Sequence, residues 1–556
     1  MLEDYYQDTL KLIPLNATFN GDHRYNDQFT NLISKEYRSS LRTHFSHYLE
    51  ELTQYDDAAL SSSEHMSKAL LRWECDLGLE GLAFPEHLRP IDQMWSVNLL
   101  VGQLASGASA QPFNTVEDYD NWLERLRGYV AWMATAQDNM KEGIASGHVL
   151  PRSLVIKVLP QLEGLAKEDL EQHLFYSPAM QIPESFSREE RDTITAAYAR
   201  MLTESIIPAY QSLHQFMSTQ YLQASRATSG IDAIPDGDAY YAHQIKKYTT
   251  LELAAEDIHQ LGLREVARIQ AEMKKVMEEV GFTGDLIAFF NHVRTNKDLM
   301  PYTDPEQVLK SFEAIHDTMK PQLAASFDLT PRTKFEIRRT EAFREASASA
   351  EYNQGSMDGT RPGIFYVPIP DVTQYNTYGD EALFLHEAIP GHHYQVSLTL
   401  ENENLPQFRK VAWNSAYGEG WGLYSESLGK ELGLYTDPYQ YFGMLGYEIH
   451  RAIRLVVDTG LHTKGWTRER AIQYSLENEA ESEASIIAEI ERYMANPGQA
   501  LAYKIGQLKI RELRNKAETS LGDNFDLRQF HNQVLETGCI PLALLEEKIE
   551  QWIHDN

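Results

Sequence analysis

Apolar side chains recur at spacings of three and four residues along most of this chain, and this period limits the folds open to it. In the segment 116–147 the residues that follow it are Tyr119, Trp122, Leu123, Leu126 and Tyr129. A helix with this period buries one apolar face against a core. Similar segments fill residues 1–230 and most of the chain after Leu383. The sequence therefore predicts a mainly α protein.

Two short segments carry strand signals instead. Residues 334–339, KFEIRR, alternate apolar and charged side chains, and residues 363–369, GIFYVPI, form a β-rich run with a proline. Together they predict a small sheet with an exposed edge.

Capping residues predict two helix starts. Thr249 and Glu252 have the spacing of a capping box and would open a long helix through residues 261–280. Asp304 followed by Pro305 is typical of an N-cap and a first helical turn.

A turn-rich segment at 226–243, RATSGIDAIPDGDAYYAH, marks the expected boundary between two lobes. We expect a helical N-terminal lobe at 1–235 and a catalytic lobe at 236–556, joined as one continuous structural unit. A chain of 556 residues is long enough for two lobes around a cleft. No repeat or low-complexity tract separates off a further domain.

Charge and cysteine content restrict the partners and the chemistry. The chain has 50 basic and 81 acidic residues, a net charge of −31. Such a surface repels phosphates, so we expect no nucleic-acid partner. Cys75 and Cys539 supply no thiol cluster for zinc and no disulfide framework, although a single bridge between them stays open.

No apolar run approaches the length of a membrane span, so we expect no integral membrane segment. The first residues, MLEDYYQDTLKLIP, have neither the basic nor the apolar region of a signal peptide. As it stands the sequence predicts a soluble, cytoplasmic protein. If a signal peptide has been removed, a periplasmic or lipid-anchored envelope location is expected. The oligomeric state is left open.

Residues 386–395, HEAIPGHHYQ, resemble a zinc motif with altered spacing. The usual HExxH pattern places two histidines four residues apart on one helical face. Here His392 and His393 follow His386 by six and seven residues. On a regular helix, residues six apart face about 240° apart, and residues seven apart lie about 10.5 Å apart along the axis. A regular helix therefore could not direct either pair at one ion.

Pro390 and Gly391 offer a solution, because proline lacks an N–H and glycine adopts unusual dihedral angles. We expect a bulge near Pro390 that returns His392 to the second ligand position. His393 is then a second-shell or substrate-binding candidate. Glu387 is predicted as the general base, since a carboxylate beside the metal can take a proton from water.

The third ligand is expected from SAYGEGWGLYSESLG, where Glu419 and Glu426 lie seven residues apart on one helical face. Only one of them can readily reach the ion. Gly418 and Gly420 flank Glu419 and permit close backbone approach, which favours Glu419. Glu426 is then a second-shell or structural candidate. His386, His392 and Glu419 would hold one zinc ion per chain.

At these residues the sequence resembles a known bacterial family, domain of unknown function 885. The similarity rests on GTRPGIFYV, HEAIPGHHYQ, AYGEGWGLYSE, RLVVDTGLH and NPGQALAYKIG, in this order. The family resembles the gluzincin metallopeptidases, and at the zinc site it is similar to Taq-type carboxypeptidases and angiotensin-converting enzyme. The resemblance implies a helical two-lobed fold with a deep cleft, and peptidase chemistry. It also selects His392 and Glu419 as ligands.

The resemblance further implies roles for residues outside the zinc motif. Tyr503 and His462 become candidate oxyanion donors, and Asp458 a candidate support for His462 or for a zinc ligand. The alternative for these residues is ordinary helix packing. GTRPGIFYV, with Tyr366, is expected to be a cleft-edge strand that pairs with substrate. Candidate cations for a substrate carboxylate, each with a surface salt bridge as the alternative, are Arg361, Arg454, Arg492 and Lys504.

The sequence thus predicts a zinc-dependent peptidase that acts on peptides. Two alternatives stay open: hydrolysis of another amide or ester by the same centre, and a catalytically silent peptide-binding protein.

Overall fold

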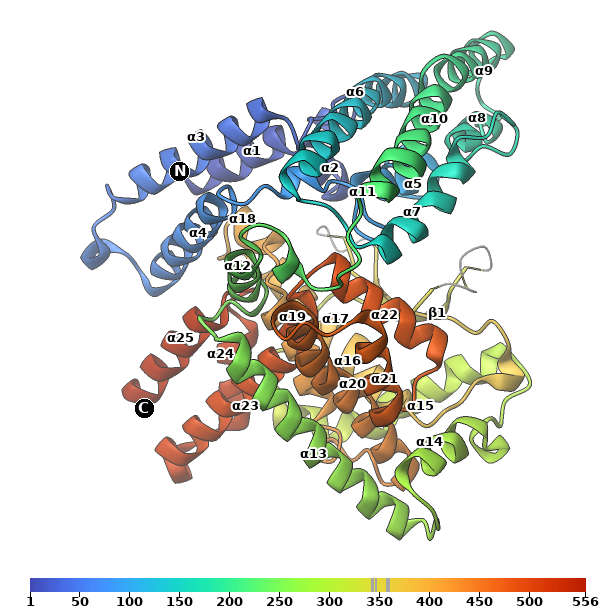
Figure 1. Ribbon diagram of the computed structural model, residues 1–556. Helices are drawn as coiled ribbons and strands as arrows, with labels where there is room; N and C mark the ends of the chain where they lie inside the picture. The colour runs from blue at the N-terminus through green and yellow to red at the C-terminus, as the bar shows by residue number, and fades with distance from the viewer. Residues whose placement is uncertain (342–344, 346–347, 357–360) are drawn as a thin grey trace. The chain divides into compact units, whose positions relative to one another are not determined.

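Figure 1 shows the computed structural model, which describes residues 1–341, 345, 348–356 and 361–556. Within them the protein is mainly α with one small sheet, as predicted. The described chain divides into two compact units, which are Met1–Tyr240 with Met494–Asn496, and Tyr241–Tyr493 with Pro497–Asn556. This division falls inside the turn-rich segment 226–243. The expected lobe boundary at 235/236 and the cleft between the lobes stay predictions.

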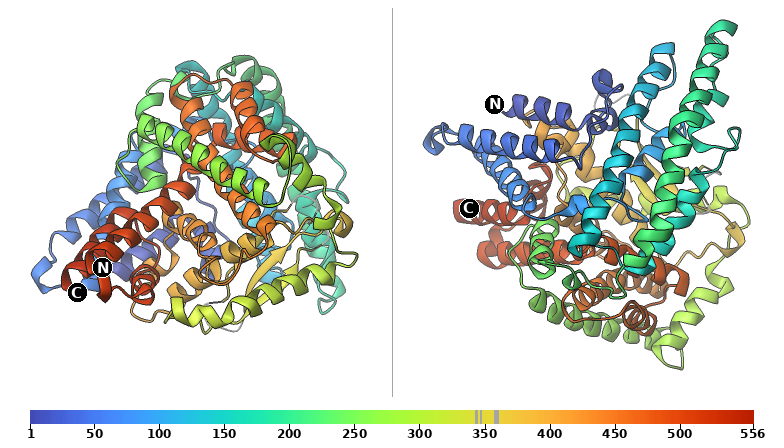
Figure 2. Two further views of the ribbon diagram at one scale, coloured as in Figure 1. Left: turned by 90° about the horizontal axis from the view of Figure 1, so that it is seen from below. Right: turned by 45° about the horizontal axis from the view of Figure 1, so that its top comes forward.

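The first unit is built from helices around an aromatic core. Its α-helices are α1 (Leu2–Leu12), α2 (Pro14–Phe19), α3 (Lys35–Leu52), α4 (Ser62–Gly81), α5 (Val97–Ala105), α6 (Val116–Ser146), α7 (Arg152–Leu165), α8 (Ser177–Met180), α9 (Arg188–Met201), α10 (Ile207–Phe216) and α11 (Leu222–Ala224). Figure 2 shows α6 beside the long helical run of α9 and α10. Trp122, Tyr129 and Trp132 of α6 are fully buried, and the hydroxyls of Tyr129 and Tyr210 share a hydrogen bond of 2.8 Å.

Helix α6 confirms the expected helix at 116–147. It begins with a capping box of Thr115 and Asp118 and ends at Gly147, which has a φ of 82°. Only glycine adopts this left-handed conformation readily. Asp304 likewise caps α15, with Pro305 in the first turn, as predicted.

The second unit contains helices and the sheet, and α12 (Gly237–Thr249) spans the division between the units. The other helices are α13 (Ala255–Glu279), α14 (Leu286–Thr295), α15 (Pro305–Ser326), α16 (Asp380–Glu387), α17 (His392–Glu401), α18 (Gln407–Val411), α19 (Ser415–Glu426), α20 (Pro438–Thr463), α21 (Arg468–Asn478), α22 (Glu483–Ala495), α23 (Ala502–Leu521), α24 (Leu527–Leu535) and α25 (Leu542–Asp555).

The predicted start of α13 is wrong. Thr249 ends α12, and its hydroxyl donates a hydrogen bond of 2.7 Å to the carbonyl of Ile245 in the preceding turn. A hydroxyl used in this way is not available to cap a following helix. Helix α13 begins instead at Ala255, without a side-chain cap.

The sheet has the order β1-β3-β2, with β1 (Phe335–Arg339), β2 (Glu351–Asn353) and β3 (Gly363–Val367). Strand β3 pairs with β1 in parallel and with β2 antiparallel. Both predicted strands are therefore confirmed, but β2 was missed because it is only three residues long.

The sheet order also corrects an expectation about substrate pairing. Strand β3, which carries Tyr366, lies in the centre of the sheet, so its backbone groups already pair on both sides. The expectation of a cleft-edge strand is wrong for the described part of GTRPGIFYV. Residues 359–360 of that motif lie outside the described residues. Tyr366 pairs across the sheet with Arg338.

Among the described residues, no helix is both long and apolar enough to cross a membrane. Cys75 and Cys539 are both free and buried, so no bridge joins them.

Candidate metal centre

His386 and His392 lie on two different helices. His386 and Glu387 are the last residues of α16, and His392 is the first residue of α17. The expected single bulged helix is therefore wrong, because residues 388–391 form a turn that separates two helices. Pro390, which offers no N–H to a helix, lies in this turn.

Gly391 and Trp421 fix this turn in place. A Cβ atom at Gly391 would overlap the carbonyl oxygens of Leu385 and His386. The turn can fold back onto α16 only because no side chain is present there. On the other side, the indole N–H of Trp421 donates a hydrogen bond of 2.9 Å to the carbonyl of Pro390. The turn is thus held between α16 and α19.

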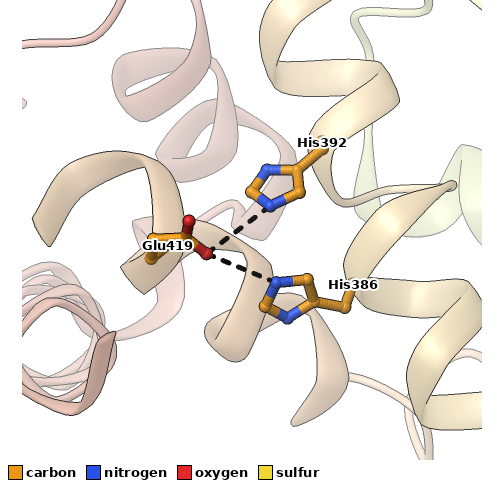
Figure 3. Close-up of side chains that lie close together, drawn as sticks. All are labelled: His386, His392 and Glu419. Carbon is orange, nitrogen blue, oxygen red and sulfur yellow. Dashed lines mark ion pairs between the residues drawn. The ribbon is translucent and has the colours of Figure 1, made fainter. Parts of the chain in front are cut away.

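Three potential metal ligands converge beside this turn (Figure 3). The Nε2 atoms of His386 and His392 lie 3.6 Å and 3.7 Å from the same carboxylate oxygen, Oε2 of Glu419. All three ligand atoms lie within 4.8 Å of one another. Atoms that bind one tetrahedral zinc ion at about 2.0–2.2 Å lie about 3.3–3.6 Å apart. The donor set and its spacing fit a zinc ion after small adjustments.

Glycines bring α19 close enough for Glu419 to join the histidines. A Cβ atom at Gly420 would lie 2.5 Å from the Cα of Gly506 in α23, and one at Gly422 would lie 2.8 Å from the imidazole of His386. The expected close backbone approach is confirmed at Gly420, whereas Gly418 lies against the side chain of Trp413. Gly422 was missed, although its place in GEGWG is a visible signal.

Glu426 orients His386 from the side opposite the cluster. Its Oε1 lies 2.7 Å from Nδ1 of His386, and both side chains are buried. A carboxylate on Nδ1 fixes the tautomer, so that the Nε2 lone pair faces the ligand cluster. Glu426 thus contacts a proposed ligand without being one of the three converging residues, and its role toward a metal ion stays a prediction. Nδ1 of His392 lies 3.3 Å from Oε1 of Gln395, one helical turn later, which the sequence analysis did not identify.

Burial and mutual attraction set the charges in the cluster. Burial lowers the pKa of His386, but attraction to Glu419 and the hydrogen bond with Glu426 outweigh it and raise the pKa to about 10. Burial raises the pKa of Glu419, and the two histidines outweigh it and hold that pKa well below its usual range. A metal ion therefore competes with a proton at His386, so binding weakens as the pH falls.

Glu387 interacts electrostatically with His386, His392 and Glu419, but it is not one of the three potential ligands. Burial raises the pKa of Glu387, and the charges of His386 and His392 oppose this increase. A raised pKa moves a carboxylate toward the range useful for a general base at neutral pH.

The structure directs His393 away from the cluster. Its Nδ1 lies 3.0 Å from the hydroxyl of Tyr352 on β2, and its ring packs against Phe335 of β1. Burial lowers the pKa of His393 to about 4, so the ring is neutral at physiological pH. His393 packs α17 against the sheet.

His462 and Asp458 are not brought to the cluster either. His462 is fully buried, and its Nε2 lies 3.1 Å from the carbonyl oxygen of Tyr493. The expectation that it is an oxyanion donor is wrong, because a substrate cannot reach it. The carboxylate of Asp458 accepts hydrogen bonds from the hydroxyl of Tyr241 at 2.5 Å and from the N–H of Gly498 at 3.1 Å, so it does not support His462.

Lys504 and Arg454 are buried and ion-paired. The ammonium of Lys504 lies 2.6 Å from Glu448 and 3.0 Å from Glu265, and its side chain is fully buried. The expectation that it binds a substrate carboxylate is wrong, because the lysine is buried and, together with Arg268, already pairs with these two glutamates. Arg454 donates a hydrogen bond of 2.9 Å to Glu489.

The other two candidate cations differ in their surroundings. Arg492 is ion-paired with Glu489, whereas Arg361 is exposed. Tyr503, by contrast, is half-buried, and the guanidinium carbon of Arg454 lies 4.6 Å from its ring centroid.

Comparison with models of protein families identifies the family of this chain. It belongs to the family described as bacterial protein of unknown function (DUF885), whose model matches residues 14–549. The family named in the sequence analysis is therefore confirmed.

Two solved structures share the fold. A putative lipoprotein from Colwellia psychrerythraea is 29% identical with a TM-score of 0.89, and the match covers 100% of this chain and 98% of that one. A putative lipoprotein of unknown function from Shewanella oneidensis is 18% identical with a TM-score of 0.78, and the match covers 98% of each chain. No curated protein matches this chain.

Proposed function

We propose that the protein is a zinc-dependent peptidase that holds one zinc ion with His386, His392 and Glu419. The observation that carries the proposal is the convergence of these ligands from three helices, with a carboxylate on Nδ1 of His386 and Glu387 beside them. A set of two histidines and one glutamate is a recurrent catalytic zinc site with a free coordination position.

A bound zinc ion would polarise a carbonyl group and lower the pKa of water. Glu387 would take a proton from the attacking water and pass it to the leaving amine. Tyr503 would donate its hydroxyl hydrogen to the developing oxyanion. Its hydroxyl makes no hydrogen bond within the part of the chain that the structure describes, which leaves it available.

Peptides are the proposed substrates because the cluster resembles the zinc site of gluzincin peptidases. The relationship of this protein to the gluzincin peptidases is itself part of the proposal. The two alternatives, hydrolysis of another amide or ester and silent peptide binding, are separated from it by the outcome of one experiment.

The test compares wild-type protein with Glu387→Gln, and with Glu469→Gln as a control at an exposed glutamate of α21. Zinc content is measured by elemental mass spectrometry, and cleavage by digestion of a peptide library. We expect one zinc ion per chain in all three proteins, and cleavage by wild type and Glu469→Gln only. Cleavage by Glu387→Gln, or no peptide cleavage by the zinc-loaded wild type, would contradict the proposal.

An envelope location is a second part of the proposal. Both solved relatives are described as putative lipoproteins, which supports the lipid-anchored option. Fractionation of the source cells with an antibody against this chain tests it: recovery in the envelope fraction is expected, and recovery in the cytosol alone would contradict it.

A further inference from the structure

Helix α20 carries an arginine, Arg451, that has no acidic partner among the described residues, in a chain where acidic residues outnumber basic ones by 81 to 50. Arg451 is half-buried, and its Nη1 donates a hydrogen bond of 3.3 Å to the carbonyl of Tyr447. Its Nε is buried and has no hydrogen-bond partner in the described part of the chain. Within residues 1–341, 345, 348–356 and 361–556, no carboxylate forms an ion pair with it. A buried donor without a partner costs free energy, which a ligand would recover.

Two tyrosine rings hold this guanidinium. Its carbon lies 5.3 Å from the ring centroid of Tyr447 and 6.0 Å from that of Tyr503. Arg454, one turn further along α20, lies 4.6 Å from the Tyr503 ring and also has a buried nitrogen, Nη1, without a partner. Cation–π contacts of this kind orient a guanidinium group without neutralising it.

The two tyrosines tie this arginine to the elements of the metal centre. Tyr503 lies one helical turn before Gly506, and Gly506 packs against Gly420, the residue after Glu419. On the other side, a Cβ atom at Gly379, which precedes α16, would lie 3.0 Å from the Tyr447 ring. Arg451 therefore lies against two tyrosines that connect it to the start of α16 and to the part of α23 that packs on α19, and these helices carry or support the proposed ligands.

We infer that Arg451 binds the C-terminal carboxylate of the peptide whose scissile bond lies at the metal centre. A guanidinium group presents parallel donors that match a carboxylate. Since an extended residue spans only about 3.3–3.6 Å, a cation on helices next to the metal centre would favour cleavage near the C-terminus of the peptide. The inference rests on the proposed function and makes the protein a carboxypeptidase that releases short fragments. Arg454 is a positioning residue that holds the Tyr503 ring.

The test uses pairs of peptides that differ only in a C-terminal carboxylate or carboxamide. Cleavage is compared for wild type, Arg451→Lys, Arg451→Gln and Arg470→Gln. Arg470 is a matched control, since it lies 5.2 Å from the Trp466 ring and is exposed. We expect wild type and Arg470→Gln to prefer the carboxylate peptide at least tenfold in kcat/KM. Arg451→Gln should lose this preference through a higher KM, Arg451→Lys should retain part of it, and the amide peptide should be cleaved equally by all four proteins.

A binding measurement separates this inference from the proposed function. Isothermal titration with an acetylated dipeptide, as the free acid and as the amide, needs no turnover. We expect the acid to bind wild type at least tenfold more tightly than Arg451→Gln, and the amide to bind both alike. Equal binding of acid and amide to wild type, or an unchanged preference in Arg451→Gln, would overturn the inference. Absence of cleavage together with this binding difference would contradict the peptidase and leave the carboxylate site standing.

Discussion

His386 shows how one residue depends on several distant ones. It is the single histidine of α16, yet its Nδ1 is held by Glu426 and its ring lies against Gly422, both from α19. The orientation of Nε2 therefore comes from α19. A ligand oriented in this way loses less entropy when it binds a metal ion.

This dependence predicts the effect of changing Glu426. Glu426→Ala should retain all three ligands but bind zinc roughly 10–100-fold more weakly, because Nδ1 of His386 loses its partner. Glu426→Gln, which still offers an acceptor oxygen, should lie between Ala and wild type. Competition with a chromophoric zinc chelator measures these affinities.

Glu431→Ala is the control, since the carboxylate of Glu431 pairs with Arg514 and not with a ligand. An unchanged zinc affinity in Glu426→Ala would show that Glu426 does not orient His386.

The sequence was sufficient to predict which residues form the candidate site, but not which candidate residues are buried in other contacts. His392 and Glu419 were selected because Pro390, Gly391 and the flanking glycines limit what the backbone can do. Lys504 and His462 were assigned wrongly because their partners come from other helices. The spacing of a motif does not reveal that Glu448 lies 2.6 Å from Lys504.

At the level of helices, the site depends on the close packing of α19 against its neighbours. Gly420 meets Gly506 of α23, and Gly422 meets the ring of His386. Glycine costs a helix roughly 1 kcal/mol relative to alanine, so three glycines within five residues weaken α19 locally. The packing they allow offsets that cost.

Alanine substitutions should separate these two effects. Gly422→Ala should displace His386 and reduce zinc content well below one ion per chain, because its Cβ atom would lie 2.8 Å from the imidazole ring. Gly446→Ala in α20, where no atom lies within 4 Å of the added Cβ, should retain zinc and raise the free energy of unfolding by up to about 1 kcal/mol. Elemental analysis and thermal melting measure both effects, and full zinc content in Gly422→Ala would contradict the packing argument.

The elements themselves were largely predictable where one local signal governs them. Helix α6 has caps at both ends and a clear apolar period, and β1 and β3 have β-rich sequences. Strand β2 and the start of α13 were not predictable, because β2 exists through pairing with β3 and the Thr249 hydroxyl is already used within α12. The break between α16 and α17 was expected as a bulge, since local sequence does not show how far a helix is interrupted.

At the scale of the whole molecule, the pH dependence of stability should contain a contribution from Asp458. This carboxyl group is fully buried between Tyr241 and Gly498. Burial outweighs the hydrogen bonds from those two residues and raises the pKa of Asp458 to about 7 from 3.8. Between about pH 4 and about pH 7 the folded protein therefore keeps a proton that the unfolded chain releases. The free energy of unfolding falls across this range, and above about pH 7 Asp458 adds no further dependence on pH.

Asp458→Asn should remove this contribution, because asparagine does not titrate. Relative to the variant, wild type should lose stability between pH 5 and pH 8, by roughly 1–3 kcal/mol. Thermal melting of both proteins at the two pH values measures the change. An equal difference in Tm at pH 5 and pH 8 would show that Asp458 titrates normally.

The family model covers nearly the whole chain, and the relative from Colwellia psychrerythraea matches all of it with a TM-score of 0.89. The fold is thus shared along its full length. The three proposed ligands come from α16, α17 and α19, which follow one another closely in sequence. Helices α20 and α23 carry Arg451 and Tyr503, the residues proposed to contact substrate. The central claim is that this arrangement exists to hold one metal ion.

X-ray data collected on both sides of the zinc absorption edge, from crystals of the zinc-loaded protein, test that claim most directly. We predict one anomalous peak per chain at about 2.0–2.2 Å from Nε2 of His386, Nε2 of His392 and a carboxylate oxygen of Glu419. The absence of a peak at this position, or a peak whose ligands do not include His392, would contradict the account.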